Sequence, residues 1–279
     1  MNTIELNLDY ANASRLLLPT SESVSIALVG CGGTGSWLTP SVARVARLLV
    51  ERGKNVDVYF IDPDRVEAKN VYRQNFCQAE IGCNKAETLA FRYGLAWGVD
   101  IVAIPEPVNE NQIRGLGQSS RLVIYIGCVD NWRARQRINH LVKNNYQRET
   151  RSWWIDCGNS KASGQVVVGC GSGKPPDPYK LPGFCTWLPL PSDRHPDLVE
   201  EQPEEKRVDP DNLSCAEMAL IDAQGLAINQ NIAGIAADYL VRLLVTHDLR
   251  RWGSYIDVES GSMRSKYIVP ENVSVETPT

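Results

Sequence analysis

A short string rich in glycine constrains the fold of this chain more than any other feature. It reads Gly30-Cys31-Gly32-Gly33-Thr34-Gly35, and it lies between a β-favouring run at 24–29 and a helical pattern that extends from Thr34 to Glu51. Without side chains, such a turn lets backbone N–H groups and the helix N-terminus approach a phosphate. The string therefore predicts the first strand, turn and helix of a nucleotide-binding α/β domain, and it suits NAD, FAD and ATP equally.

The rest of the chain alternates strands with helices. β-Favouring runs predict strands at 56–61, 101–104, 121–126, 153–157 and 165–168, and apolar periodicity predicts helices at 84–97, from Trp132 onward and at 214–246. This order implies right-handed βαβ units around a parallel sheet. We therefore expect an α/β fold with a Rossmann-like, doubly wound sheet that is mostly parallel. A hairpin around Gly261 would add an antiparallel C-terminal extension.

Composition and charge exclude several classes of protein. The 279 residues include 29 Lys and Arg and 33 Asp and Glu, so the net charge is −4. That balance argues against binding nucleic acid through a basic surface, and no apolar run reaches the ~20 residues that span a bilayer. We expect a soluble, cytoplasmic protein without nucleic-acid or membrane partners. The eight cysteines contain no Cys-x-x-Cys pair, so we expect no structural zinc.

Charged residues separate the candidate nucleotides. Asp62 follows the second predicted strand, 27 residues after Gly35, where a carboxylate can accept hydrogen bonds from ribose hydroxyls. Up to this point an NAD-dependent oxidoreductase and an adenylating enzyme fit equally. Arg73 and Lys85 favour the adenylating enzyme, because charge builds up on the α-phosphate and the pyrophosphate as they separate. A nicotinamide site has no special need of fixed cations.

A polar pair, Asp130 and Asn131, follows the strand at 121–126. The carboxyl ends of parallel strands line one crevice, so we expect this pair at the same edge of the sheet as the glycines and Asp62. A carboxylate there is placed to hold Mg²⁺ that bridges phosphate oxygens. The competing interpretation is that Asp130 caps the helix that begins near Trp132.

These motifs together resemble the pattern of the ThiF/MoeB/HesA family, the ubiquitin-activating-enzyme-like adenylyltransferases. That pattern runs G-x-G-G-x-G, then D-x-D-x-V-x-x-x-N-x-x-R-Q, then G-x-x-K, then D-N. Its elements stand here in the same order, at Gly30–Gly35, Asp62–Gln74, Gly82–Lys85 and Asp130-Asn131. The resemblance covers residues 24–170 well and the remainder loosely.

The resemblance implies that the protein activates a carboxylate with ATP. The C-terminal carboxylate of a small ubiquitin-like or sulfur-carrier protein would attack the α-phosphate, giving an acyl-adenylate and pyrophosphate. Carried over by position, the implied roles are ribose binding by Asp62, phosphate contacts by Asn70, Arg73 and Lys85, and Mg²⁺ binding by Asp130. The resemblance also implies a homodimer in which an N-terminal arginine of one subunit reaches the phosphates of the other. Arg15 is the candidate for that arginine.

A cysteine is the candidate for a second chemical step. Ser214 and Glu217 have the spacing of a capping box. This places Cys215 in the first helical turn, where backbone N–H groups favour a thiolate. Cys215 also resembles the family's cysteine that accepts the activated carboxyl as a thioester or takes part in sulfur transfer, with Cys185 as the alternative. A packed, unreactive cysteine is the competing interpretation.

The resemblance and the composition together suggest a division of the chain. Residues 171–212 hold nine of the sixteen prolines and an acidic cluster, which disfavours regular helix or strand. We expect an ATP-binding adenylation core at 1–170 and a Pro-rich acidic crossover excursion at 171–213. A long helix and a hairpin at 214–279 would complete the same domain. The layout looks most like the ThiF-type members of plasmid-borne PRTRC clusters, which are associated with a ubiquitin-like companion.

Two other functions remain alternatives. An NAD-dependent oxidoreductase would use the glycine string and Asp62, but it would leave Arg73, Lys85 and Asp130 without a function. A non-catalytic module would keep the nucleotide pocket for stability alone. Exchange of labelled pyrophosphate into ATP separates the adenylyltransferase from both.

Overall fold

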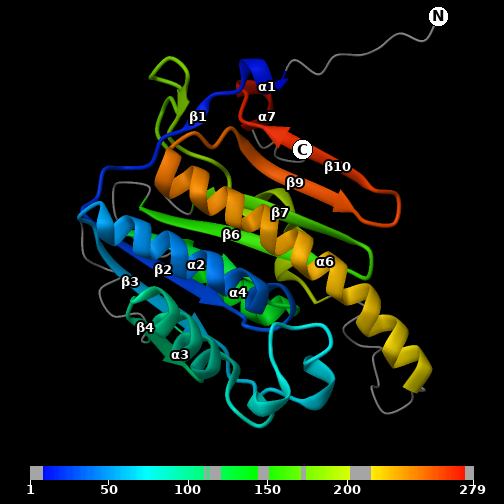
Figure 1. Cartoon of the computed structure of the whole chain (residues 1–279). Helices are drawn as coiled ribbons and strands as arrows, with labels where there is room; N and C mark the ends of the chain where they lie inside the picture. Colours follow the sequence, from blue (N-terminus) through cyan, green and yellow to red (C-terminus); the bar gives the residue numbers. More distant parts are fainter. Residues whose placement is uncertain are drawn as a thin grey trace, which may run out of the picture.

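A single mixed sheet forms the centre of the computed structural model, which describes residues 9–109, 112, 121–143, 151–170, 174–201 and 215–273. Within these residues the sheet has eight strands in the order β10-β9-β7-β6-β5-β2-β3-β4 (Figure 1). Their bounds are β2 Ser23–Val29, β3 Asn55–Ile61, β4 Ile101–Ile104, β5 Arg121–Gly127, β6 Ser152–Asn159, β7 Ser163–Cys170, β9 Arg251–Asp257 and β10 Ser262–Tyr267.

Five neighbouring strands of the sheet are parallel. β2 pairs with β3 on one side and β5 on the other, while β4 extends the β3 side and β6 extends the β5 side. The chain therefore reverses its direction of travel across the sheet at β2, which is the place where open α/β sheets bind ligands. The predicted strands coincide with these five to within one or two residues at their ends.

The remaining strands are antiparallel. β7 pairs antiparallel with β6 and with β9, and β9 forms a hairpin with β10. This confirms the predicted fold class, including the antiparallel C-terminal extension. The hairpin extends from Arg251 to Tyr267 around Gly261, where the sequence predicted it.

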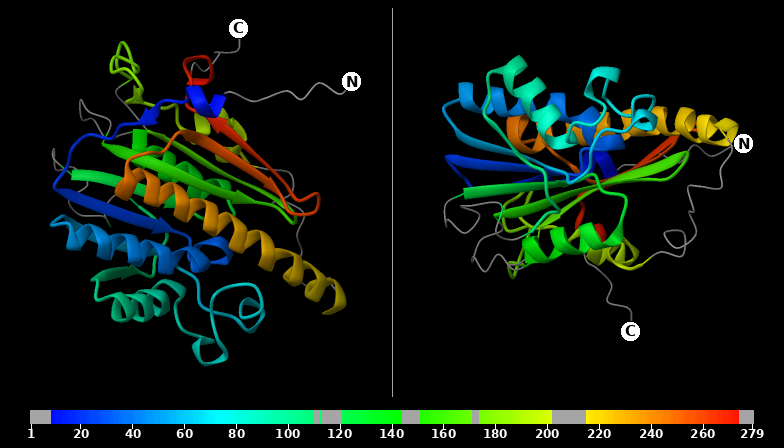
Figure 2. Two further views of the ribbon diagram at one scale, coloured as in Figure 1. Left: turned by 45° about the horizontal axis from the view of Figure 1, so that its top comes forward. Right: turned by 90° about the horizontal axis from the view of Figure 1, so that it is seen from below.

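Helices cover both faces of the sheet (Figure 2). α2 (Gly33–Glu51), α3 (Lys85–Trp97) and α6 (Cys215–Val241) lie on one face, and α4 (Trp132–Lys143) and the short α5 (Pro191–Arg194) lie on the other. Successive side chains of β2 point to opposite faces of the sheet, which explains this arrangement. Ile26 and Leu28 pack on the side of the first group of helices, and Ala27 and Val29 pack on the side of the second. Both faces are therefore hydrophobic, as expected of buried parallel strands.

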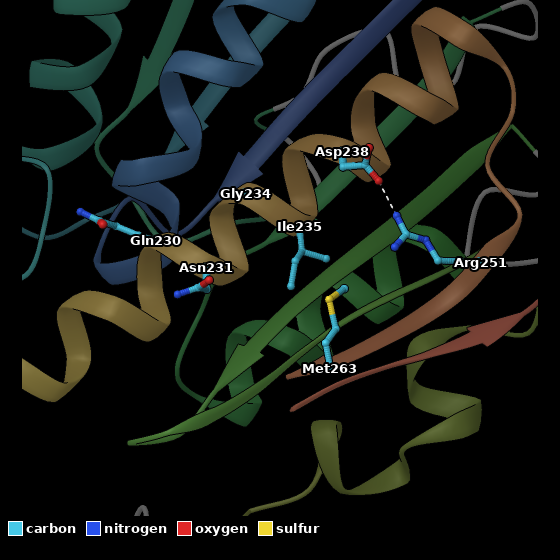
Figure 3. A pocket seen from close by; sticks show the side chains of 7 residues that line it. All are labelled: Gln230, Asn231, Gly234, Ile235, Asp238, Arg251 and Met263. Atoms are coloured by element: carbon cyan, nitrogen blue, oxygen red, sulfur yellow. Dashed lines mark hydrogen bonds and ion pairs between the residues drawn. The ribbon is translucent and has the colours of Figure 1, made fainter. Parts of the chain in front are cut away.

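α6 is the longest helix of the described chain, and it continues through Gly225 without a break to a π-helical turn at Arg242–Thr246. Its first turns extend beyond the sheet (Figure 1). A groove of about 490 Å³, here called the outer groove, lies between α6 and the β9–β10 hairpin. Figure 3 shows Asp238 of α6 there, in an ion pair with Arg251 of β9. Asn231 and Met263 also line this groove. No helix in the described ranges is both long and apolar enough to cross a membrane.

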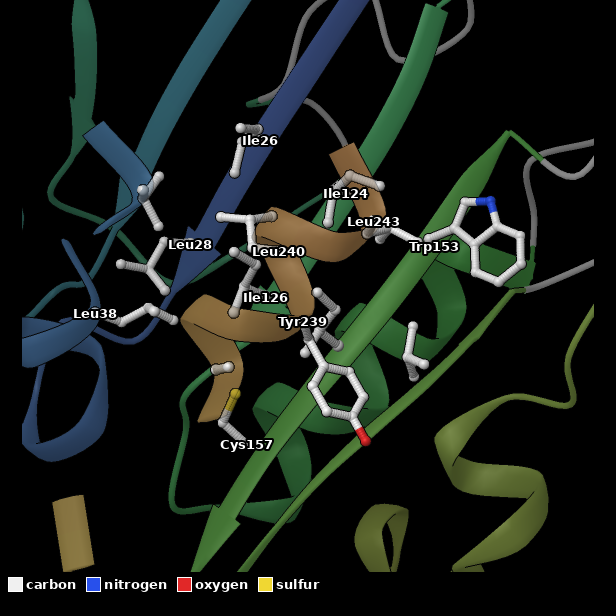
Figure 4. Close-up of a cluster of buried hydrophobic side chains, with 14 of the residues drawn as sticks. Ile26, Leu28, Leu38, Ile124, Ile126, Trp153, Cys157, Tyr239, Leu240 and Leu243 are labelled. Atoms are coloured by element: carbon white, nitrogen blue, oxygen red, sulfur yellow. The ribbon is translucent and has the colours of Figure 1, made fainter. Parts of the chain in front are cut away.

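The larger part of the core fills the space between the sheet and α2 and α6. Figure 4 shows Leu28, Leu38 and Leu240 together there, with Tyr239 and Trp153 nearby, all fully buried. Burial of such side chains stabilises the fold by roughly 1.5–3 kcal/mol each. Close packing fixes α6 against the glycine-rich turn that opens α2.

Short elements complete the structure. In the Pro-rich region, 174–201, the described residues form β8 (Phe184–Cys185), α5 and the 3₁₀ turn η3 (Pro196–Val199). β8 pairs with β1 (Arg15–Leu16) in a separate two-stranded sheet. The other short elements are α1 Asp9–Asn12, η1 Ala68–Asn70, η2 Gln78–Glu80 and α7 Pro270–Val273.

Candidate functional site

A pocket of about 720 Å³ lies at the carboxyl ends of β2, β3 and β5. It brings together residues from all four sequence motifs, and their roles toward a ligand remain predictions. The predicted residues that line it are Gly30, Gly32, Gly33, Asp62, Asn70, Arg73, Lys85, Asp130 and Asn131. Gly35 is not in the wall. A β-carbon on Gly35 would overlap the carbonyl oxygen of Gly30, so this glycine serves the closure of the turn.

The glycine-rich turn presents backbone atoms to the pocket because side chains have no room there. Gly30 has a φ of +88°, and a β-carbon on it would lie 2.8 Å from the carbonyl carbon of Cys128. Gly32 is the N-cap of α2. The free N–H groups of the first turn of α2 therefore lie at the pocket, where they favour an anion.

Asp62 holds the glycine-rich turn against the end of β3. The residue is 5% exposed, and its Oδ2 accepts a hydrogen bond from the N–H of Cys31 at 2.6 Å. Oδ1 accepts one from the N–H of Asp64 at 2.8 Å. Burial raises the pKa of Asp62, and the two N–H groups and Lys85 oppose part of that rise. Each carboxylate oxygen has further acceptor capacity, which a ribose hydroxyl can use.

Lys85 is the first residue of α3, and Asn84 fixes its position. The Asn84 side chain caps the helix by accepting from the N–H of Glu87 at 3.0 Å. Its Nδ2 donates to the carbonyl oxygens of Asp62 and Asp64 at 2.9 and 3.0 Å. Lys85 Nζ lies 2.9 Å from Asp64 Oδ2, and the side chains of the pair are 9% and 65% exposed. The cation is thus almost buried, while its partner is largely in solvent.

Asn70 and Arg73 lie in the segment that leads from β3 toward α3. Asn70 is buried, and its Oδ1 accepts from the N–H of Glu67 at 2.9 Å, which closes the turn η1. The Arg73 side chain is partly buried in the pocket wall. Trp37 of α2 donates its indole N–H to the carbonyl oxygen of Arg73 at 3.1 Å. This bond ties the arginine's backbone to the helix that follows the glycine-rich turn.

Asp130 and Asn131 are neighbours in the chain, but their side chains lie in different surroundings. Asn131 Oδ1 accepts from the N–H of Ala134 at 2.9 Å, so Asn131 caps the start of α4. Asp130 is exposed in the pocket wall, where its Oδ1 accepts a 3.3 Å bond from Asn131 Nδ2. Its carboxylate oxygens have the hard-ligand chemistry that Mg²⁺ prefers. Within the described ranges, no group of three His, Cys, Asp or Glu side chains could hold a metal ion.

Sequence reasoning missed several residues of the pocket. Arg133 and Arg137 of α4 and Lys161 after β6 add cations to its wall. Arg133 and Arg137 are one helical turn apart and follow the Asp-Asn pair, so they lie on the same face of α4. That spacing was a local signal that could have indicated them. Among the described lining residues, six cations face four carboxylates, which favours an anionic ligand. The cations are Lys69, Arg73, Lys85, Arg133, Arg137 and Lys161, and the acids are Asp62, Asp64, Glu67 and Asp130.

A polar cluster from three distant segments was also missed. Asn229 of α6 accepts hydrogen bonds through Oδ1 from the Thr34 hydroxyl at 3.1 Å and from Asn159 Nδ2 at 2.6 Å. All three residues line the pocket. Thr34 and Asn229 are 195 positions apart in the chain, so no local pattern could have indicated their contact.

A second cavity of about 860 Å³ adjoins the first, and Asn159 and Ser160 line both. Its wall includes His195, whose Nε2 lies 2.7 Å from the Tyr255 hydroxyl. It also includes Arg135, which lies 3.1 Å from the fully buried carboxylate of Asp156. Burial raises the pKa of Asp156, and Arg135 opposes that rise.

The two candidate cysteines differ in position. Cys215 begins α6, fourteen residues before Asn229 in the same helix, which corresponds to about 21 Å along the helix axis. Ser214, the proposed cap, lies outside the described residues. Cys185 is fully buried and donates to the carbonyl oxygen of Trp187 at 3.0 Å, and burial raises its pKa. A buried, protonated thiol is a poor nucleophile.

Arg15, the candidate for an arginine acting across a dimer, is exposed in β1 opposite Phe184. It does not line the pocket of its own chain.

Comparisons with known proteins agree with this architecture. The sequence profile of the ThiF family matches residues 11–265. A search of curated proteins found no match. Among solved structures, PaaA aligns with a TM-score of 0.51 at 19% identity, over 88% of this chain and 64% of that chain. The E. coli protein MccB with ATP aligns with a TM-score of 0.55 at 14% identity, over 96% of this chain and 69% of that chain. Identities this low show the fold alone, and the chain spans about two thirds of the length of these proteins.

Proposed function

Because this chain belongs to the ThiF family, we propose that it is an ATP-dependent adenylyltransferase. Its substrate would be the C-terminal carboxylate of a small ubiquitin-like or sulfur-carrier protein. The observation that carries the proposal is the cation-lined pocket at the glycine-rich turn, where Arg73 and Lys85 from separate segments face the same space. The release of pyrophosphate requires fixed cations because negative charge builds up on the phosphates. A nicotinamide site has no such requirement.

In the proposed reaction, a carboxylate oxygen of the substrate attacks the α-phosphorus of ATP. The bond from that phosphorus to the bridging oxygen breaks, and the electron pair leaves with pyrophosphate. Lys85 and Arg73 stabilise the charge on the phosphates, and Asp62 orients the ribose. Mg²⁺, when held at Asp130, would neutralise part of the charge on the phosphate oxygens.

The second cavity supports a polypeptide as the second substrate. It shares the lining residues Asn159 and Ser160 with the nucleotide pocket, so an extended chain end could lie there with its carboxylate beside the nucleotide. The structural neighbour MccB was solved with AMPCPP and MccA together. We extend to this chain the binding of a nucleotide together with a second molecule.

The later steps are part of the same proposal. Transfer of the activated carboxyl to Cys215 would form a thioester and release AMP. Because Cys215 starts α6 about 21 Å along the helix from Asn229, this transfer requires the start of α6 to approach the pocket. A homodimer with Arg15 acting in trans would add one more cation to the phosphates of the partner.

Exchange of labelled pyrophosphate into ATP, measured with candidate ubiquitin-like partners, tests the proposal. We expect partner-dependent exchange that is lost in Arg73→Ala, Lys85→Ala and Asp130→Asn. Arg47→Ala is the matched control, since Arg47 lies on α2 outside the pocket, with a 42% exposed side chain that pairs with Glu51. Exchange that persists undiminished in the three pocket variants would refute the proposal. Tight ATP binding without exchange for any partner would favour a non-catalytic module instead.

A further inference from the structure

Asn229 has a donor group directed into the nucleotide pocket. The residue is 6% exposed, and its Oδ1 already accepts hydrogen bonds from Thr34 and Asn159. The Asn159 amide nitrogen can only donate, so the Asn229 atom that faces it is the oxygen. Nδ2 therefore points elsewhere, and none of the described residues accepts a hydrogen bond from it. Since Asn229 lines the pocket, the two N–H bonds of Nδ2 are available to a ligand.

The surroundings of Nδ2 place it beside the glycine-rich turn, the part of the pocket where we expect the phosphates of a nucleotide. A β-carbon on Gly33 would lie 2.6 Å from Asn229 Oδ1, so Asn229 lies directly against the first residue of α2. A β-carbon on Gly225, one turn earlier in α6, would lie 3.8 Å from Nδ2 and 3.9 Å from Cδ of Arg73. Nδ2 thus lies between the N-terminus of α2 and the side chain of Arg73, the two groups best suited to bind a phosphate.

We propose that Asn229 is a binding residue whose Nδ2 donates a hydrogen bond to a phosphate oxygen of ATP. This inference rests on the proposed function and extends it. Thr34 and Asn159 hold the amide in the orientation that presents the donor, so the group needs no rearrangement when the nucleotide arrives. Through this residue the bound phosphates contact α6, the helix that begins at Cys215.

Two variants and one matched control test the inference. Asn229→Ala removes the donor, and Asn229→Asp keeps the acceptor for Thr34 and Asn159 while replacing the donor with an oxygen. Asn231→Ala is the control, because Asn231 lies two residues further along α6 and lines the outer groove (Figure 3). Isothermal titration calorimetry gives the Kd for ATP and for adenosine, which lacks phosphates. Thermal unfolding without ligand reports whether each variant folds.

We expect the Kd for ATP to rise about tenfold or more in both Asn229 variants, since a hydrogen bond to a charged group is lost. The Kd for adenosine should stay unchanged in both, and Asn231→Ala should match the wild type for both ligands. Unchanged ATP affinity in Asn229→Ala would overturn the inference, and so would an equal loss of affinity for ATP and adenosine. If the wild type binds ATP but catalyses no exchange, the proposed function fails alone. If it binds no ATP, both fail.

Discussion

Replacing Asp62 with alanine should destabilise the protein even without nucleotide. The change removes the acceptors for two backbone N–H groups, those of Cys31 and Asp64. Cys31 is fully buried, and a buried N–H that loses a charged acceptor costs about 1.5–3 kcal/mol. Asp64 is exposed, so water replaces its lost bond and the cost there is about 0.5 kcal/mol. Burial raises the pKa of the Asp62 carboxyl because it disfavours the charged form. Removing this carboxylate therefore offsets part of the loss in stability.

The expected net loss in Asp62→Ala is therefore about 2 kcal/mol in the free energy of unfolding. Urea denaturation at pH 7 without ATP, followed by tryptophan fluorescence, measures it as a lower midpoint at an unchanged m-value. Asp100→Ala is the control, since Asp100 is exposed between α3 and β4, and it should change stability by less than about 0.5 kcal/mol. A loss in Asp62→Ala no larger than in the control would refute the idea that Asp62 anchors the glycine-rich turn.

Three further predictions concern packing, pH and thiol reactivity. Gly35→Ala should destabilise by about 1–3 kcal/mol because its β-carbon overlaps the backbone of the turn. Gly234→Ala, in a helix with open space around it, should instead gain up to about 1 kcal/mol in the same urea assay. Burial raises the folded-state pKa of Asp156 above its ordinary 3.8. Its contribution to stability is therefore lost as pH rises from 3.8 to the raised value. In Asp156→Asn this fall should be absent from a pH series of unfolding curves, and a wild-type-like slope would contradict the assignment. Iodoacetamide should label the exposed Cys77 and Cys83 in the folded protein, whereas rapid labelling of the buried Cys185 would contradict its burial.

Local patterns predicted the fold and much of the candidate site for a physical reason. The glycine-rich turn, Asp62, Asn70, Lys85 and the Asp-Asn pair each follow a strand or begin a helix, and parallel strands bring such positions to one edge. Contacts that depend on packing between distant helices left no local signal. Asn229 meets Thr34 only because α6 packs across α2. The cap of α4 depended on which of two neighbouring side chains turned toward the helix, and the structure assigns it to Asn131.

The pocket holds the Lys85 ammonium group in place without a ligand, through an ion pair with Asp64. Burying an ammonium group is costly unless an anion pairs with it, and Asp64 Oδ2 lies 2.9 Å from Lys85 Nζ. Because the Asp64 side chain is 65% exposed, solvent screens the pair and its carboxylate can return to water at little cost. In the proposed reaction, a phosphate of ATP would therefore replace Asp64 and make the stronger interaction with Lys85. A fully buried carboxylate in the same place would instead have held the cation against the substrate.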